Sequence, residues 1–145
     1  MDIESYLYEY QRATQDKERL LVELERVRAR YEDAYDRQSQ TIRYDLARVK
    51  KPAEMSVVER AAILIIDDLR GEVDAIEREL EKANTTIRSL KKLIECLGWM
   101  EKNYIRMKYF EGRSNEYMTK NLKCSERTLG LLKNSALNKL EKEIN

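Results

Sequence analysis

The 145-residue chain contains no histidine and has only one proline, four glycines and two cysteines. Without histidine it lacks the commonest general base and the commonest metal ligand of proteins. Cys96 and Cys124 have neither metal-site spacing nor the pattern of a disulfide framework, so we expect small packing residues in a reducing compartment. A glycine-rich phosphate loop is also missing. We therefore expect no enzymatic activity, no metal and no cofactor.

Long apolar segments are absent as well. The longest apolar run, residues 61–66, has six residues, whereas a membrane-spanning helix needs about 18. The first ten residues are acidic and lack the basic start of a signal peptide. These absences favour a cytoplasmic protein without membrane contact.

The residues that are present favour helices. Charged residues make up 38% of the chain and the mean hydropathy is -0.74. Few helix breakers and no alternating strand pattern indicate an all-α fold. We predict a long helical hairpin or coiled coil over residues 1–98, followed by a small helix-turn-helix domain over residues 99–145.

Residues 2–37 carry a seven-residue repeat and are predicted to form one helix. With Ile3 at position a, nine of the ten a and d positions are apolar, and Lys17 is the exception. This pattern is typical of a coiled-coil seam. The seam residues that we expect to mediate dimerisation are Ile3, Tyr6, Tyr10, Leu20, Leu24, Val27 and Tyr31.

A second long helix is predicted over residues 55–97, after a connector at 38–54. Its apolar line runs from Val58 through Ile65 and Leu69 to Leu97. Neither long helix can bury its apolar stripe alone, so the seam closes within the chain, against a second chain, or both. We expect both, which means a helical hairpin that forms a homodimer or a higher homo-oligomer.

The last third of the chain predicts three short helices, at 100–112, 113–122 and 125–144, with Ser114 and Ser125 as N-caps. The spacing of the apolar residues between the last two helices is that of a helix-turn-helix motif. Lys123 stands at a turn position often held by glycine. The residues expected to point inward are Met118, Leu122, Cys124, Leu129 and Leu132.

This region resembles region four of bacterial sigma-70 factors and, more narrowly, the C-terminal domain of phage and prophage transcription regulators of the RinA and ArpU type. The resemblance covers about 40 residues. It is carried by a Tyr-Phe-x-Gly turn, by the opening of the recognition helix and by its end: Tyr109, Phe110, Gly112, Ser125, Arg127, Thr128, Ala136, Leu137, Lys139 and Leu140.

The resemblance implies a sequence-specific regulator of late phage genes, acting as a dimer on double-stranded DNA in the cytoplasm of a bacterial host. RNA polymerase is a further partner to consider, because region four of sigma factors also contacts it. The residues expected to meet DNA from the last helix are Ser125, Glu126, Arg127, Thr128, Leu131, Lys133 and Asn134. Further phosphate contacts are expected from Lys108, Arg113, Lys120 and Lys123.

Charge and side-chain chemistry limit this expectation. Residues 100–145 carry ten Lys and Arg against six Asp and Glu, while residues 1–99 carry eighteen against twenty-one. The basic excess therefore lies where phosphate binding requires it. Gly130 and Leu131, however, leave the reading face with few polar groups for base edges.

Two other functions stay open at this point. The chain could be a coiled-coil structural or adaptor protein whose C-terminal domain docks protein through the apolar side chain of Leu131. It could also be a phage DNA-packaging protein that recognises DNA with the same small fold.

Overall fold

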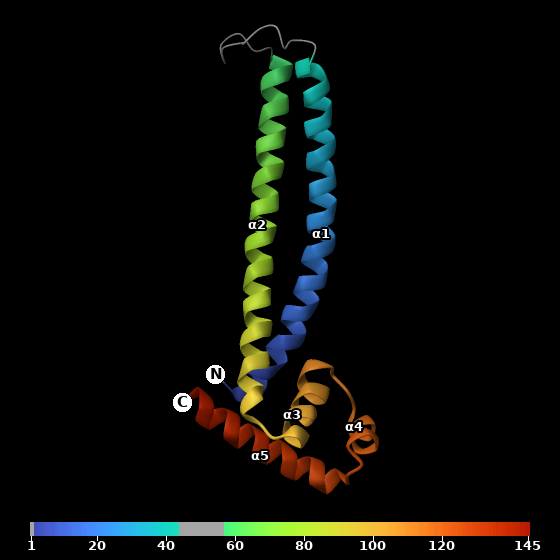
Figure 1. The fold of residues 1–145 in the computed structure, drawn as a ribbon, viewed down its shortest axis with the longest axis vertical. Helices are drawn as coiled ribbons and strands as arrows, with labels where there is room; N and C mark the ends of the chain where they lie inside the picture. Colours follow the sequence, from blue (N-terminus) through green and yellow to red (C-terminus); the bar gives the residue numbers. More distant parts are fainter. Residues whose placement is uncertain (1, 44–56) are drawn as a thin grey trace. The chain divides into compact units, whose positions relative to one another are not determined.

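The computed structural model describes residues 2–43 and 57–145, and of residues 38–43 it describes the backbone alone. These parts are helical and hold no β-strand, which confirms the all-α prediction. The long helices are α1 (Ile3–Arg43) and α2 (Val57–Leu93), and the shorter elements are η2 (Ile94–Cys96), α3 (Trp99–Ile105), η3 (Arg106–Phe110), α4 (Asn115–Leu122) and α5 (Glu126–Ile144) (Figure 1).

The ends of the helices differ from the predicted ones by a few residues. The first helix continues to Arg43 instead of ending at residue 37, and residues 44–54 of the predicted connector lie outside the described residues. The predicted helix 100–112 is α3 followed by the π-helical turn η3. Gly112, at φ +71°, ends this segment because its missing side chain permits a left-handed backbone.

Contacts divide the chain into two compact units, one of residues 1–17 with 82–145 and one of residues 18–81. The sequence predicted a boundary at residue 98. The units divide elsewhere because the first turns of α1 and the last turns of α2 pack with the short helices. Each unit has its own hydrophobic core.

In the unit of residues 18–81, α1 and α2 run antiparallel and side by side (Figure 1). An ion pair of 2.6 Å between Arg28 and Glu77 joins the two helices. The heptad seam of α1 is thus closed by the same chain. The buried residues between the helices are Leu20, Leu24, Val27, Leu69, Ile76 and Leu80.

The first turns of α2 face differently from the prediction. Val58 and Ile65, both on the predicted apolar line, are 77% and 54% exposed. Ala62, which was also on the predicted line, is half-buried, and Ile66 is half-buried in place of Ile65. Steps of three and four residues lead from Leu69 to these two positions, so the interior of the hairpin continues through them and leaves Ile65 on a flank.

The core of the other unit combines all of its helical elements. Leu7 of α1, Ile105 of α3 and Met118 of α4 are completely buried in it. The first turns of α1 therefore belong to the same core as the short helices. The remaining buried residues of this core are Ile3, Leu90, Ile94, Leu97, Tyr104, Tyr109, Leu122, Leu129, Ala136 and Leu140.

Candidate nucleic-acid interface

Helices α4 and α5 are joined by a three-residue turn and are both capped by serine. The Ser114 hydroxyl accepts a hydrogen bond of 3.2 Å from the Tyr117 backbone N–H. The Ser125 hydroxyl accepts a bond of the same length from the Thr128 N–H. These caps satisfy backbone donors that a helix start otherwise leaves unpaired. Both serines were predicted as N-caps, and this prediction is confirmed.

The turn holds the one described non-glycine residue with a positive φ. Lys123, at φ 53° and ψ 47°, adopts the left-handed conformation that ends α4. A residue with a Cβ is strained there, which explains why glycine is often found at this position. Met118, Leu122 and Leu129 are buried around the turn, as the helix-turn-helix spacing predicted, and Cys124 is partly buried.

The outer side of α5 forms an exposed surface, which we call the α5 ridge: Ser125, Glu126, Arg127, Gly130, Leu131 and Asn134. The side chain of Leu131 is 63% exposed. A Cβ at Gly130 would meet no atom within 4 Å, so no described residue packs against this position of the helix. Thr128 is half-buried because its hydroxyl lies 3.0 Å from that of the Ser125 cap.

The inner side of α5 is fixed by a carboxylate of α3. Ser135 donates a 2.8 Å hydrogen bond to Glu101, and the Lys139 ammonium lies 2.9 Å from the same oxygen. Burial alone would raise the pKa of Glu101, but the bonds from Lys139 and Ser135 lower it. With this side held by α3, the α5 ridge is the side left for a ligand.

Three predicted phosphate contacts are exposed around the turn: Arg113, Lys120 and Lys123. Arg113 lies 4.7 Å from the Tyr117 ring centre and 3.6 Å from Glu111, and Lys120 lies 3.6 Å from Glu116. Ion pairs between exposed side chains contribute little stability. They can therefore exchange for phosphate at small cost.

Lys133 and Lys108, which were also predicted to contact phosphate, contact other residues of the protein: Lys133 a carboxylate of α1, and Lys108 the rings of Tyr104 and Tyr109. The Lys133 ammonium is 3.2 Å from Glu4, and this hydrogen bond raises the pKa of Lys133. The Lys108 ammonium is 5.6 Å from the ring centre of Tyr109, and burial lowers the pKa of Lys108. Both cations are engaged within the protein and lie outside the exposed set.

Three residues of α1 hold the segment before α4: Glu4 and Gln11, which the sequence did not single out, and Tyr10, which was predicted to mediate dimerisation. Glu4 accepts a 2.8 Å hydrogen bond from the Tyr109 hydroxyl, and Gln11 donates one of 2.8 Å to the Tyr109 carbonyl. Tyr10 stacks on Phe110 with 3.9 Å between the ring centres. The tyrosines crowded into the first ten residues were the only available signal, because an ordinary coiled-coil seam is mainly aliphatic.

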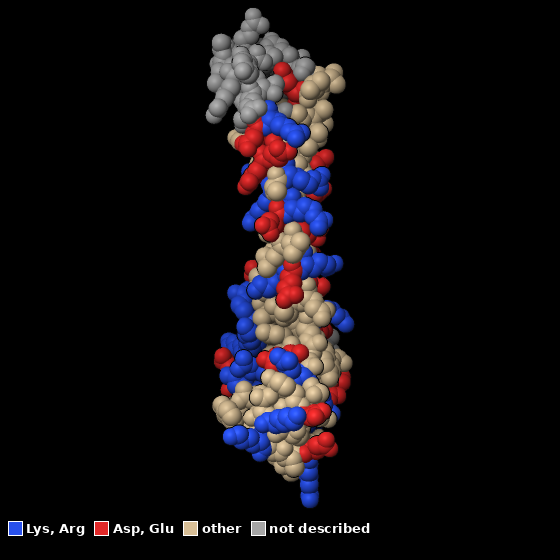
Figure 2. All heavy atoms as spheres, turned by 90° about the vertical axis from the view of Figure 1, so that its right-hand side faces the viewer, with Lys and Arg blue, Asp and Glu red and all other residues tan. Residues whose placement is uncertain are grey.

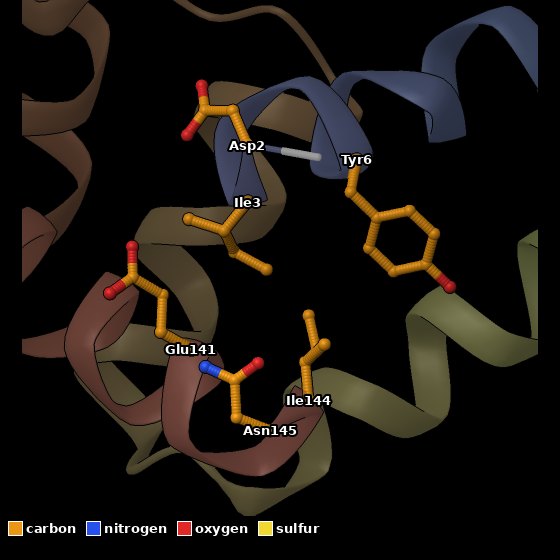
Figure 3. A pocket seen from close by; sticks show the side chains of 6 residues that line it. All are labelled: Asp2, Ile3, Tyr6, Glu141, Ile144 and Asn145. Carbon is orange, nitrogen blue, oxygen red and sulfur yellow. The ribbon is translucent and has the colours of Figure 1, made fainter.

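The C-terminal end of α5 has carboxylates around it, in contrast to the exposed cations near the start of the helix. A hollow of about 450 Å³ is lined there by Asp2, Ile3, Tyr6, Glu141, Ile144 and Asn145. Figure 3 shows Ile3 and Ile144 pointing toward each other, with two carboxylates at the edge. Carboxylates at the negative end of a helix dipole repel phosphate. Along α5, phosphate contact is therefore more favourable at the first turns than at this end.

Basic residues do not gather in one block on the face of the molecule that Figure 2 shows. On the face in Figure 2, Lys and Arg are interspersed with Asp and Glu. A broad positive field is thus absent from this face, and attraction to a polyanion depends on local cations.

The residues predicted to mediate dimerisation are all engaged within one chain. Ile3, Tyr6 and Tyr10 pack in or against the core of the unit that contains α5. Leu20, Leu24, Val27 and Tyr31 pack in the hairpin. A second chain could reach the buried residues Leu20, Leu24 and Val27 only by opening the hairpin.

No protein family model, curated protein or solved structure matches the chain. Among the described residues, no helix combines the length and the apolar character needed to cross a bilayer. The same residues contain no group of Cys, Asp and Glu side chains that could hold a metal ion.

Proposed function

We propose that this protein is a sequence-specific DNA-binding transcription regulator whose α5 ridge enters the major groove. The observation that carries the proposal is the division of α5 into two sides. The inner side is held by Glu101 and the core, and on the outer side Arg127 and Asn134 are exposed, with no described element over them. A capped helix with a free polar side after a tight turn is the geometry by which such motifs read DNA.

The ridge offers a small set of base contacts. Arg127 suits a guanine edge or a phosphate, and Asn134 suits an adenine edge. Glu126 can accept from a cytosine amino group, and Leu131 can touch a thymine methyl. Gly130 lets the helix approach closely because it has no side chain to clash.

The phosphate contacts that we propose are fewer than the sequence predicted. Arg113, Lys120 and Lys123 are exposed, and the exposed ion pairs of Arg113 and Lys120 can be exchanged for contacts to a phosphate backbone. Lys133 and Lys108 are assigned to the packing of α1 instead, because Glu4 and the aromatic rings already engage them.

A DNA-binding module with few base contacts binds a two-part site with higher affinity when two copies are joined. Two copies held together bind a two-part site more tightly, since the second contact is effectively intramolecular. The resemblance to RinA and ArpU regulators makes late phage promoters the expected targets, with RNA polymerase as a further partner.

A binding titration tests the proposal. Fluorescence anisotropy would compare candidate promoter DNA with random duplex DNA across a salt series. Affinity should fall steeply with salt, and Arg127→Ala should lose about 1–3 kcal/mol on the preferred site. Arg26→Ala, which changes an exposed arginine of the hairpin, is the matched control and should bind normally. Absence of binding at low salt would refute the function.

The exposed leucine supports a second candidate, an adaptor that docks protein through the α5 ridge. Leu131 is 63% exposed and the Trp99 side chain 72% exposed. Large exposed apolar side chains are frequent at protein interfaces. Leu131→Arg separates the two functions, because an added cation should strengthen DNA binding but abolish an apolar protein contact.

A DNA-packaging protein would use the same ridge. The preferred duplex distinguishes it, since a regulator selects promoter DNA and a packaging protein selects a genome packaging site.

A further inference from the structure

The outward face of α2 in the hairpin carries large apolar side chains that no other described residue buries. Leu64 is 62% exposed and Val57 is 83% exposed. At about 100° per residue, Leu64 lies on the side of α2 opposite the half-buried Ala62 and Ile66, so it points away from α1. A helix that is apolar on this outward side as well as on its inner side needs a second covering surface.

The sequence around Leu64 is complementary to itself. Arg60 precedes Leu64 by four residues, and Asp68 follows it by four. Val57 precedes it by seven residues, and Gly71 follows it by seven. All four are exposed and lie within about 40° of the direction of Leu64 around the helix axis.

In an antiparallel pair of α2 helices related by a two-fold axis at Leu64, these residues meet across the interface. Each Arg60 faces the partner's Asp68, and each Val57 faces the partner's Gly71. A two-fold axis makes every such contact occur twice. In a parallel pair the same arginines would face each other and repel.

The shape of the face also fits a second helix. A Cβ placed on Gly71 would meet no atom within 4 Å, so the partner's Val57 can approach the backbone there. Ala61 is exposed as well and is the other small residue beside Leu64. Small residues beside a central leucine allow two helix axes to come close together.

We propose that a second copy of this chain covers this face of α2, in an antiparallel arrangement centred on Leu64. This interface supplies the dimer on which the proposed regulatory function relies, but it does not depend on DNA binding. It replaces the predicted seam of α1, whose residues pack within one chain in the two hydrophobic cores. The proposed partner is a second copy because the face is self-complementary: its arginine matches its own aspartate, and its valine matches its own glycine, when two copies meet across a two-fold axis.

The oligomeric state tests the proposal without DNA. Light scattering with a dilution series should give a dimer for the full chain and a monomer for Leu64→Glu. The matched control is Val22→Glu, which changes an aliphatic residue of α1 that is 60% exposed, and it should stay dimeric. Circular dichroism should show that both variants keep their helicity.

Charge reversal tests the register. Arg60→Asp and Asp68→Arg, each alone, should weaken the dimer roughly tenfold or more, because like charges then face each other twice. The double variant should recover the dimer. A mixture of the two single variants should form heterodimers, since each supplies the charge that the other needs.

A crosslink adds a direct readout. In a background with Cys96→Ser and Cys124→Ser, Leu64→Cys should oxidise to a crosslinked dimer, whereas Val22→Cys should not. A monomeric full chain, a dimeric Leu64→Glu variant, a monomeric Val22→Glu variant or a double charge variant without recovery would overturn the interface. None of these measurements contains DNA. Loss of the dimer should weaken binding to a two-part site, whereas salt-dependent binding that Arg127→Ala removes would still support DNA recognition, so the failures of the two proposals are distinguishable.

Discussion

The hydroxyl of Tyr109 donates a 2.8 Å hydrogen bond to the carboxylate of Glu4, which lies 105 positions earlier in the chain. The Lys133 ammonium lies 3.2 Å from the same carboxylate. Glu4 of α1 is thus bonded to η3 through Tyr109 and to α5 through Lys133. The start of the first long helix is therefore a structural part of the proposed DNA-binding unit.

Acid should weaken this unit through Glu4. The hydrogen bond from Tyr109, and then the one from Lys133, hold the pKa of Glu4 below its ordinary value of 4.5. The unfolded chain then binds a proton at a higher pH than the folded chain does. The stabilisation is therefore present above about pH 4.5 and is lost as the pH falls through the lower folded pKa. Urea midpoints measured along a pH series should fall less for Glu4→Gln than for the native chain. Glu25→Gln, an exposed change elsewhere on α1, should keep the native profile.

Leu7→Ala should destabilise the unit that contains α5. Leu7 is completely buried in that core, and truncating such a leucine costs about 2–5 kcal/mol. Leu21 lies on the same helix and is 47% exposed. Leu21→Ala should therefore lower the free energy of unfolding by less than about 1 kcal/mol. Denaturant unfolding followed by the fluorescence of Trp99 measures both. Equal losses would mean that the start of α1 does not belong to this core.

Lys123→Gly should change stability and DNA affinity in opposite directions. Glycine removes the strain of the left-handed backbone, which amounts to about 1–2 kcal/mol. The same change deletes a proposed phosphate contact, so the slope of log affinity against log salt should become shallower by about 0.9. Lys133→Ala is the comparison, because its ammonium is bound to Glu4 and its loss should leave the salt slope nearly unchanged. A larger slope change in Lys133→Ala would reverse our assignment of these cations.

Two substitutions of Ser125 should separate capping from DNA contact. Ser125→Ala removes the acceptor for the Thr128 N–H and should cost about 1 kcal/mol of stability. Ser125→Asp keeps an acceptor at the cap, so stability should be retained. Its negative charge lies where a phosphate is proposed, however, so DNA affinity should fall in anisotropy titrations. Full DNA affinity in Ser125→Asp would move the phosphate away from the start of α5.

Several features of this protein were determined by local sequence alone. The helical fold follows from the scarcity of proline and glycine and from the apolar periodicity. Ser114 and Ser125 were predictable as caps because a cap depends on a side chain and a backbone N–H only three residues away. The burial of Met118, Leu122 and Leu129 follows from their spacing around one short turn.

Only the tertiary structure decided which surfaces remain for partners. The heptad repeat of α1 indicates an apolar seam but does not identify the helix that covers it, and α2 of the same chain does so in the hairpin. The same limit explains Lys133, whose place in the sequence is beside the α5 ridge and whose ammonium is bound to Glu4. Periodicity fixes the side of a helix on which a residue lies. The element that packs against that side is chosen by contacts between distant positions, and the sequence pattern carries no record of those contacts.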